Sequence, residues 1–128
     1  MARRERISGP GIPEHTNPFS AAVKIGNLLF SAAVGGDDPD THELPSDKES
    51  QIRNAFQTVR NMLEQAGGSP ENIAKVTVYV EDRSIRPMVN PYWIEMFPEE
   101  DDRPVRHFFP ANRPAGRHIQ LEFIAVLD

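Results

Sequence analysis

Two charged side chains stand inside segments that otherwise have the apolar pattern of β-strands. Arg106 lies in "RPVRHFFP" (residues 103–110), and Glu122 lies in "HIQLEFIAV" (residues 118–126). Burying an unpaired charge costs a large free energy, so each group must reach water, pair with another charge or bind a ligand. The pattern therefore leaves three interpretations open: a ligand site, an Arg106–Glu122 ion pair, and side chains that extend to solvent from an edge strand.

Several kinds of chemistry are excluded by the remaining residues. The chain contains no cysteine, so disulfides, thiolate ligands and thiol nucleophiles play no part. Ser31 has no evident His–Asp support, so we interpret it as a hydrogen-bonding pocket residue and not as a nucleophile. The histidines lack the spacing and acidic neighbours of a zinc site, so we expect no metal; they are His15, His42, His107 and His118.

Length and charge limit the class of protein. The 128 residues suit a single domain, which we assign to residues 1–128 with residues 1–16 as an extended N-terminal segment. No apolar run approaches the roughly 20 residues of a membrane-spanning helix, and the basic N-terminus is not followed by a signal peptide's apolar segment. We therefore expect a soluble, cytoplasmic protein. The net charge of -5 argues against general affinity for nucleic acid.

The strands are predicted from short apolar runs. Residues 19–34 contain two such runs around Gly26-Asn27, a dipeptide suited to a two-residue hairpin turn. "IAKVTVYV" alternates apolar and polar residues, the period-two pattern of a half-buried strand. Further strands are predicted at residues 104–109 and 118–126, joined by a loop rich in proline.

The clearest predicted element is a helix over residues 47–66. Its apolar residues recur at spacings of three and four, which places them on one stripe. Ser46 and Glu49 fit a capping box at the start of this helix, and Gly67-Gly68 suits the left-handed stop at its end.

A second helix is indicated by the apolar residues between Met88 and Met96. Pro91 lacks the N–H that an interior helical turn would use. Either Asn90 caps a helix that has Pro91 at its first position, or a longer helix bends there. The start of this helix therefore stays open between residues 85 and 90.

The predicted order of elements is β-β-α-β-α-β-β, which defines an α+β fold. A sheet with both helices on one face would bury the apolar stripes of the helices. The opposite face, where it is apolar, would then be covered by another subunit, so we expect an oligomer.

The chain as a whole resembles the RidA family, also called the YjgF or L-PSP endoribonuclease-like family. "RPVRHFF" is similar to the family's arginine-containing strand, and "IQLEFIAV" resembles its C-terminal strand with a glutamate. "LLFSAAVGGD" resembles the family's second strand, serine and glycine-rich turn, and "VNPYWIEMF" resembles its second helix. The two strands are the most specific of these four matches.

This resemblance implies a fold, an assembly and an activity. The fold is chorismate-mutase-like, with a mixed sheet and two helices packed on one face, and it assembles as a homotrimer with clefts between subunits. Family members that have the arginine hydrolyse reactive imines and enamines to 2-keto acids and ammonia, without metal or organic cofactor. The implied partner is thus a small carboxylate substrate bound in an intersubunit cleft.

The resemblance also implies roles for particular residues. Arg106 is the carboxylate clamp and Glu122 the residue that positions or activates water, while Ser31 and Asn90 line the cleft. The chemistry agrees, because a guanidinium offers parallel N–H donors that match a carboxylate. An imine carbon is already electrophilic, so one carboxylate that presents water can suffice.

Three positions depart from the family pattern, and all three lie among the expected substrate-binding residues. Phe19 replaces a tyrosine, Ala32 replaces a glycine, and Phe108 stands where many relatives have cysteine. These changes predict a more apolar pocket for a larger or flatter acid, and a branch of the family that deaminates 2-aminomuconate offers one kind of substrate.

Two other functional classes remain as alternatives. A non-catalytic trimer that binds carboxylate ligands, as a sensor or chaperone, would use the same arginine without turnover. A ribonuclease or RNA-binding protein, as the older family name suggests, is disfavoured by the negative net charge and the lack of interleaved basic and aromatic residues.

Overall fold

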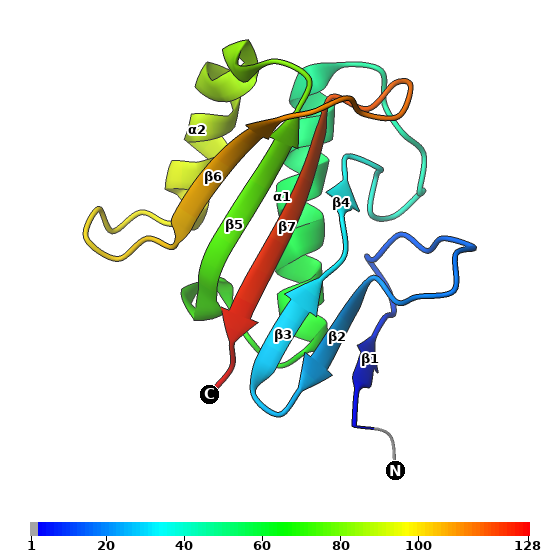
Figure 1. The fold of residues 1–128 in the computed structure, drawn as a ribbon, viewed down its shortest axis with the longest axis vertical. Coiled ribbons are helices and arrows are strands. Elements are labelled where there is room, and N and C mark those ends of the chain that lie inside the picture. Colours follow the sequence, from blue (N-terminus) through cyan, green and yellow to red (C-terminus); the bar gives the residue numbers. More distant parts are fainter. Residues whose placement is uncertain (1–2) are drawn as a thin grey trace.

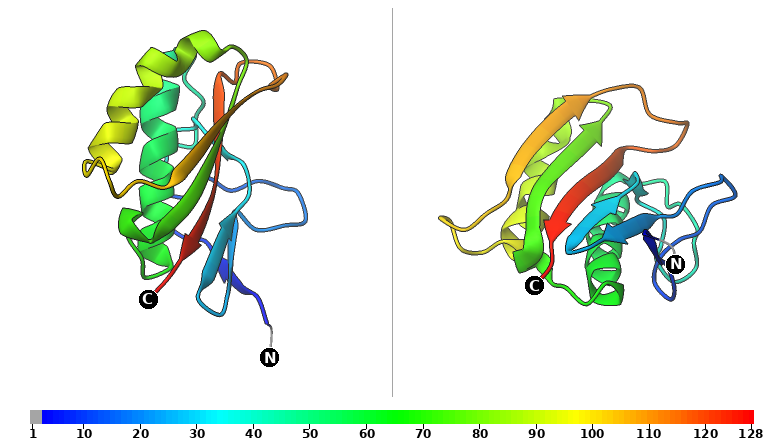
Figure 2. Two further views of the ribbon diagram at one scale, coloured as in Figure 1. Left: turned by 60° about the vertical axis from the view of Figure 1, so that its left-hand side comes forward. Right: turned by 60° about the horizontal axis from the view of Figure 1, so that its bottom comes forward.

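The computed structural model describes residues 3–128 as one mixed β-sheet with two α-helices packed on one face (Figures 1 and 2). The strand order is β1-β2-β3-β7-β5-β6, with β4 also paired to β7. Only the β5–β6 pair is parallel among these strands. The strands are β1 (Glu5–Ile7), β2 (Ala22–Ile25), β3 (Leu28–Ser31), β4 (Val34–Gly35), β5 (Ile73–Val80), β6 (Val105–Pro110) and β7 (Ile119–Val126). The helices are α1 (Lys48–Gln65) and α2 (Arg86–Met96), with short 3-10 turns η1 (Pro70–Asn72) and η2 (Arg83–Ile85).

The strands follow the predicted pattern with two additions. The prediction for β5 agrees with its observed bounds, and β6 and β7 each begin one residue later than expected. The hairpin turns at Gly26, which has a φ of 59°, while Asn27 keeps a negative φ. β1 and β4 were not predicted because strands of 3 and 2 residues are too short to show alternation.

The start of α1 differs from the prediction by one residue. The N-cap is Asp47 and not Ser46, since the Asp47 carboxylate accepts a hydrogen bond from the Ser50 backbone N–H at 2.8 Å. A carboxylate is favoured here because it faces the positive end of the helix dipole. The predicted C-terminal stop is confirmed: Gly67 has a φ of 83° and donates its N–H to Glu64.

α2 adopts the longer of its two predicted forms. It begins at Arg86 and has Pro91 in its interior, so Asn90 does not cap it. Pro87 occupies the first turn, where no N–H is needed. The buried side chains of Val89, Trp93 and Met96 hold α2 against the sheet despite the lost hydrogen bond at Pro91.

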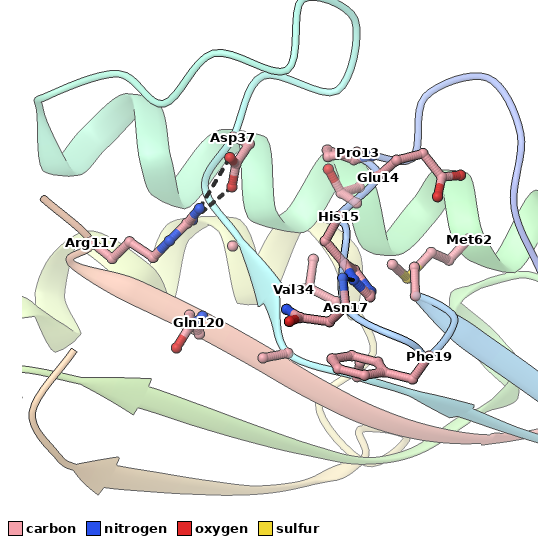
Figure 3. A pocket seen from close by; sticks show the side chains of 15 residues that line it. Pro13, Glu14, His15, Asn17, Phe19, Val34, Asp37, Met62, Arg117 and Gln120 are labelled. Atoms are coloured by element: carbon pink, nitrogen blue, oxygen red, sulfur yellow. Dashed lines mark hydrogen bonds and ion pairs between the residues drawn. The ribbon is translucent and has the colours of Figure 1, made fainter. Parts of the chain in front are cut away.

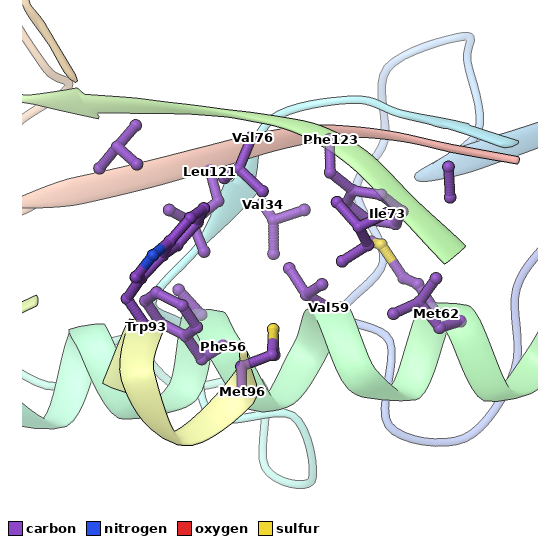
Figure 4. Close-up of a cluster of buried hydrophobic side chains, with 14 of the residues drawn as sticks. Val34, Phe56, Val59, Met62, Ile73, Val76, Trp93, Met96, Leu121 and Phe123 are labelled. Atoms are coloured by element: carbon purple, nitrogen blue, oxygen red, sulfur yellow. The ribbon is translucent and has the colours of Figure 1, made fainter. Parts of the chain in front are cut away.

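The core fills the space between the sheet and the helices (Figure 4). Alternate residues of β5 and β7 are buried there, including Val76, Val78, Leu121 and Phe123. They pack on the buried stripe of α1, as the helical spacing predicted. No helix within residues 3–128 is long and apolar enough to cross a membrane.

The opposite face of the sheet, here called the open face, is not covered by either helix (Figure 2). It carries large apolar side chains that alternate with the buried ones along each strand. An apolar surface of this kind marks a contact with another protein surface more often than it marks a free one. Its exposed members are Leu28, Phe30, Val105, Phe109 and Val126.

Gln51 connects α1 to the loop that precedes this helix and to the loop that leads into β7. Its side chain is fully buried. The amide Nε2 donates to the carbonyls of Pro45 and Gly116, both at 2.7 Å, and Oε1 accepts from the His118 N–H at 2.9 Å. One side chain thus provides hydrogen-bond partners for three backbone groups of these loops.

We expect Gln51→Leu to lower the free energy of unfolding by about 3 kcal/mol, because it leaves two carbonyls and one N–H without partners. Urea denaturation followed by circular dichroism measures the change. Gln57→Leu, on the exposed side of the same helix, is the matched control and should change stability by less than about 0.5 kcal/mol. Equal losses in both variants would contradict the role of Gln51.

Candidate functional site

Arg106 lies on the edge strand of the sheet and points toward the helices. β6 pairs only with β5, and its register places Arg106 beside Val76 and Phe108 beside Val78. Neighbours in a parallel pair share a face, and both valines are buried beneath the helices. Arg106 and Phe108 therefore lie on the helix-covered face, next to α2.

The side chain of Arg106 is held by a polar and two aromatic groups. Its Nη1 donates a hydrogen bond to Oδ1 of Asn90 at 2.9 Å. Its Cζ atom lies 4.8 Å from the ring centroid of Trp93 and 4.6 Å from that of Phe108. Ring faces attract a cation and orient it without neutralising it. The guanidinium is thus positioned but keeps its full charge.

No carboxylate of the described chain neutralises Arg106. The ion pairs formed among residues 3–128 are Arg6–Glu14 and Arg117–Asp37. Burial, and secondarily the positive charge of Arg86, lowers the pKa of the Arg106 guanidinium. A half-buried cation in this condition is stabilised by any anion that reaches it. The Arg106–Glu122 ion pair, one of the interpretations left open by the sequence, is absent.

Glu122 lies on the other side of the sheet. Thr77 of β5 is paired with both His107 of β6 and Glu122 of β7, so these three residues share the open face. The Tyr79 hydroxyl makes a long hydrogen bond of 3.5 Å to Oε1 of Glu122. Burial and the nearby Glu122 carboxylate raise the pKa of Tyr79, which keeps its hydroxyl protonated as a donor.

The predicted catalytic pair is therefore not brought together within one chain. Arg106 and Glu122 occupy opposite faces of the sheet because their strand neighbours, Val76 and Thr77, are consecutive residues of β5. A small molecule held by Arg106 cannot reach Glu122 of the same chain through the sheet. If both residues act on one substrate, two chains must supply them.

Ser31 has a local structural contact. Its Oγ accepts a hydrogen bond from the backbone N–H of Phe123 at 2.9 Å. The β3–β7 ladder ends at Phe30, and the β4–β7 ladder begins at Val34. The hydroxyl thus replaces a missing backbone partner where β7 passes from one neighbour to the other.

Phe19 and Ala32 line a separate cavity of about 280 Å³ near the N-terminal segment (Figure 3). Phe19 is 57% exposed and lies against His15, with 4.3 Å between ring centroids. Arg117 and Asp37 form an ion pair at 2.6 Å on the other side of this cavity. The residues around Arg106 do not line this cavity, nor a larger one of about 380 Å³ between η1 and the loop before β6.

Three residues near the predicted site were not assigned to it from the sequence. Trp93 is buried, and its ring also contacts Arg106. Tyr79 could have been found from the sequence, because alternation along β5 places it on the same face as Thr77, the strand neighbour of Glu122. Arg86 precedes Asn90 by four residues, a helical spacing that becomes visible only once α2 is known to begin at residue 86.

The sequence matches a family model described as Endoribonuclease L-PSP over residues 11–127. The chain belongs to this family, the RidA/YjgF family. A RutC family protein of Pyrococcus abyssi is 33% identical over 124 residues, covering 95% of this chain and 96% of that protein. The 2-iminobutanoate/2-iminopropanoate deaminase of Escherichia coli is 30% identical over 122 residues, covering 94% of this chain and 95% of that protein.

Solved structures of the family confirm the fold. The crystal structure of E. coli TdcF with bound serine superposes with a TM-score of 0.87 at 25% identity, covering 97% of this chain and 99% of that one. The resemblance stated from sequence motifs is thus confirmed, as is the α+β fold. The family includes imine deaminases alongside proteins named only for RutC or L-PSP.

The described residues show no cluster suited to a metal ion. No group of three or more histidine, aspartate or glutamate side chains within residues 3–128 is arranged to hold one. His118 is tied to the carbonyl of Ser46 through Nε2 at 3.0 Å. The groups around Arg106 are suited to electrostatic binding of an anion beside two aromatic rings.

We expect Arg106→Met to change the free energy of unfolding by less than about 1 kcal/mol, because it removes a desolvated cation that has no carboxylate partner. Asp37→Asn is the contrasting control: it leaves the Arg117 guanidinium without its partner and should cost about 1–3 kcal/mol. Thermal denaturation measures both. A loss in Arg106→Met as large as that in Asp37→Asn would assign Arg106 a structural role.

Proposed function

We propose that this chain is a cofactor-independent deaminase that hydrolyses 2-imino and 2-enamino acids to 2-keto acids and ammonia. The observation that carries the proposal is the Arg106 guanidinium, positioned by Asn90 and two aromatic rings without a carboxylate partner. Two relatives support it: one is named an iminobutanoate/iminopropanoate deaminase, and another was solved with serine, itself an amino acid with a free carboxylate.

The proposed reaction requires few functional groups of the protein. Arg106 binds the substrate carboxylate through parallel N–H donors, which places the adjacent imine carbon in a defined position. Glu122 accepts a proton from a water molecule while the oxygen of that water adds to the imine carbon. Glu122 passes this proton to the imine nitrogen, which gives a carbinolamine. The new hydroxyl then gives its proton to the amino nitrogen as the C–N bond breaks, so ammonia leaves and a keto group remains. The 2-aminomuconate type of substrate predicted from the sequence belongs to this class.

A homotrimer with sites between subunits would unite the two residues. Three observations support this assembly: Arg106 and Glu122 lie on opposite faces, β6 is an edge strand, and the open face is apolar. In such an assembly, the open face of one subunit covers the edge of the next. Arg106 then meets Glu122 of the partner subunit, and the crevice around the bound acid becomes closed to bulk water.

We expect the wild-type protein to release ammonia and keto acid from imines generated by an amino-acid oxidase. Arg106→Ala should lower kcat/KM by about 100-fold or more, and Arg106→Lys should retain part of the activity, because lysine keeps the charge but loses the paired donors. Ammonia release coupled to glutamate dehydrogenase measures the rates. The matched control is Arg53→Ala, an exposed arginine of α1.

Equal rates for wild type and Arg106→Ala would disprove the deaminase proposal. Carboxylates that raise the melting temperature of the wild type but not of Arg106→Ala, without any turnover, would instead favour the non-catalytic carboxylate-binding alternative.

A mixed assembly tests whether two subunits share each site. Arg106→Ala and Glu122→Gln proteins should each be inactive, but co-expression should restore about one quarter of the wild-type rate, the fraction of interfaces that pair both intact residues. Analytical ultracentrifugation checks that trimers form, and Phe109→Glu on the open face should dissociate them. Co-expressed variants that stay inactive as trimers would place both residues outside a shared site.

A further inference from the structure

A second unpaired arginine lies beside the proposed carboxylate clamp. Arg86 is the first residue of α2, and its Cζ atom lies 5.0 Å from the ring centroid of Phe108. The Cζ atom of Arg106 lies 4.6 Å from the same centroid. Both guanidinium groups therefore lie near the same ring, and their Cζ atoms are no farther apart than the sum of these two distances. Neither takes part in the ion pairs found among residues 3–128.

The helical spacing of α2 directs Arg86 and Asn90 to the same side. Residues four apart on a helix are neighbours on its surface. Asn90 hydrogen-bonds Arg106, and Phe108 contacts both arginines. Arg86, Asn90, Arg106 and Phe108 thus form one group of neighbouring side chains between the start of α2 and β6.

Two like charges at this separation repel one another. Burial and, secondarily, the positive charge of Arg86 lower the pKa of Arg106. The Phe108 ring attracts both cations but supplies no net negative charge. One bound carboxylate would neutralise one guanidinium and leave the other uncompensated. Two carboxylates on one ligand would neutralise both.

We propose that Arg86 is a substrate-binding residue that makes this site selective for dicarboxylates. The inference rests on the carboxylate-binding role of Arg106 in the proposed function. Arg106 holds the carboxylate next to the reactive carbon, and Arg86 holds the distal carboxylate of the same molecule. Phe108 and Trp93 lie beside the carbon chain between them. A monocarboxylic imino acid of equal length leaves Arg86 without a partner and binds more weakly.

Matched pairs of acids test this selectivity by isothermal titration calorimetry. Glutarate and adipate are compared with pentanoate and hexanoate, which have the same chain lengths but one carboxylate. We expect the wild type to bind the dicarboxylates about 10- to 100-fold more tightly, as one charge-assisted contact provides. Arg86→Gln should reduce the preference to about 3-fold or less while leaving the affinity for monocarboxylates unchanged.

Arg83→Gln is the matched control for this experiment. It removes the same charge three residues earlier, from the exposed η2 turn, so a general electrostatic effect would appear equally in both variants. Because Arg86 is exposed, its replacement should not change the melting temperature. Equal affinity of the wild type for both kinds of acid, or equal losses in the two variants, would overturn the inference.

The same comparison with imines separates this inference from the proposed function. The imine of D-glutamate, made by D-aspartate oxidase, is compared with that of D-norvaline, made by D-amino-acid oxidase. Selective glutarate binding through Arg86 without hydrolysis of either imine would refute the deaminase and keep the dicarboxylate site. Equal hydrolysis of both imines, unchanged in Arg86→Gln, would keep the deaminase and refute the selectivity.

Discussion

The arrangement around α2 and β6 depends on one constraint: the Arg106 guanidinium is partly removed from water and has no carboxylate partner among residues 3–128. Desolvation of a cation is costly, and most buried arginines recover the cost through an ion pair. Here one amide oxygen and two ring faces recover only part of it. The part of the desolvation cost that is not recovered favours the binding of an anion. Neutral groups position the Arg106 guanidinium without removing this affinity.

The two faces of the sheet divide the proposed chemistry. The helix-covered face carries the anion-binding groups, and the open face carries the carboxylate of Glu122 together with exposed apolar side chains. Consecutive residues of a strand cannot share a face, so no side-chain movement within one chain would unite them. This geometry makes the assembly a part of the proposed site. The same apolar surface that would form the trimer would also close the crevice around the substrate.

Family membership sets the fold more firmly than the substrate. One fold supports many specificities, because the residues around a site change while the scaffold stays. In this chain the start of α2 contributes Arg86 to the region around Phe108. The proposed preference for a second carboxylate therefore depends on a few side chains at one helix end.

The sequence by itself determined the order of the longer strands and the two helices, because burial of every second or every third to fourth side chain is a local pattern. It predicted β5 and the extent of α1 closely, and it singled out Arg106 and Glu122 as charges that need an explanation. Tertiary packing decided that Pro91 lies inside α2, since buried contacts of that helix outweigh one lost hydrogen bond. It also decided which face each charge occupies. Alternation orders the side chains within a strand, but only the pairing register relates one strand to the next, and here it separates Arg106 from Glu122. The position of α2 beside β6 brings Arg86 and Asn90 next to Phe108 and Arg106 instead.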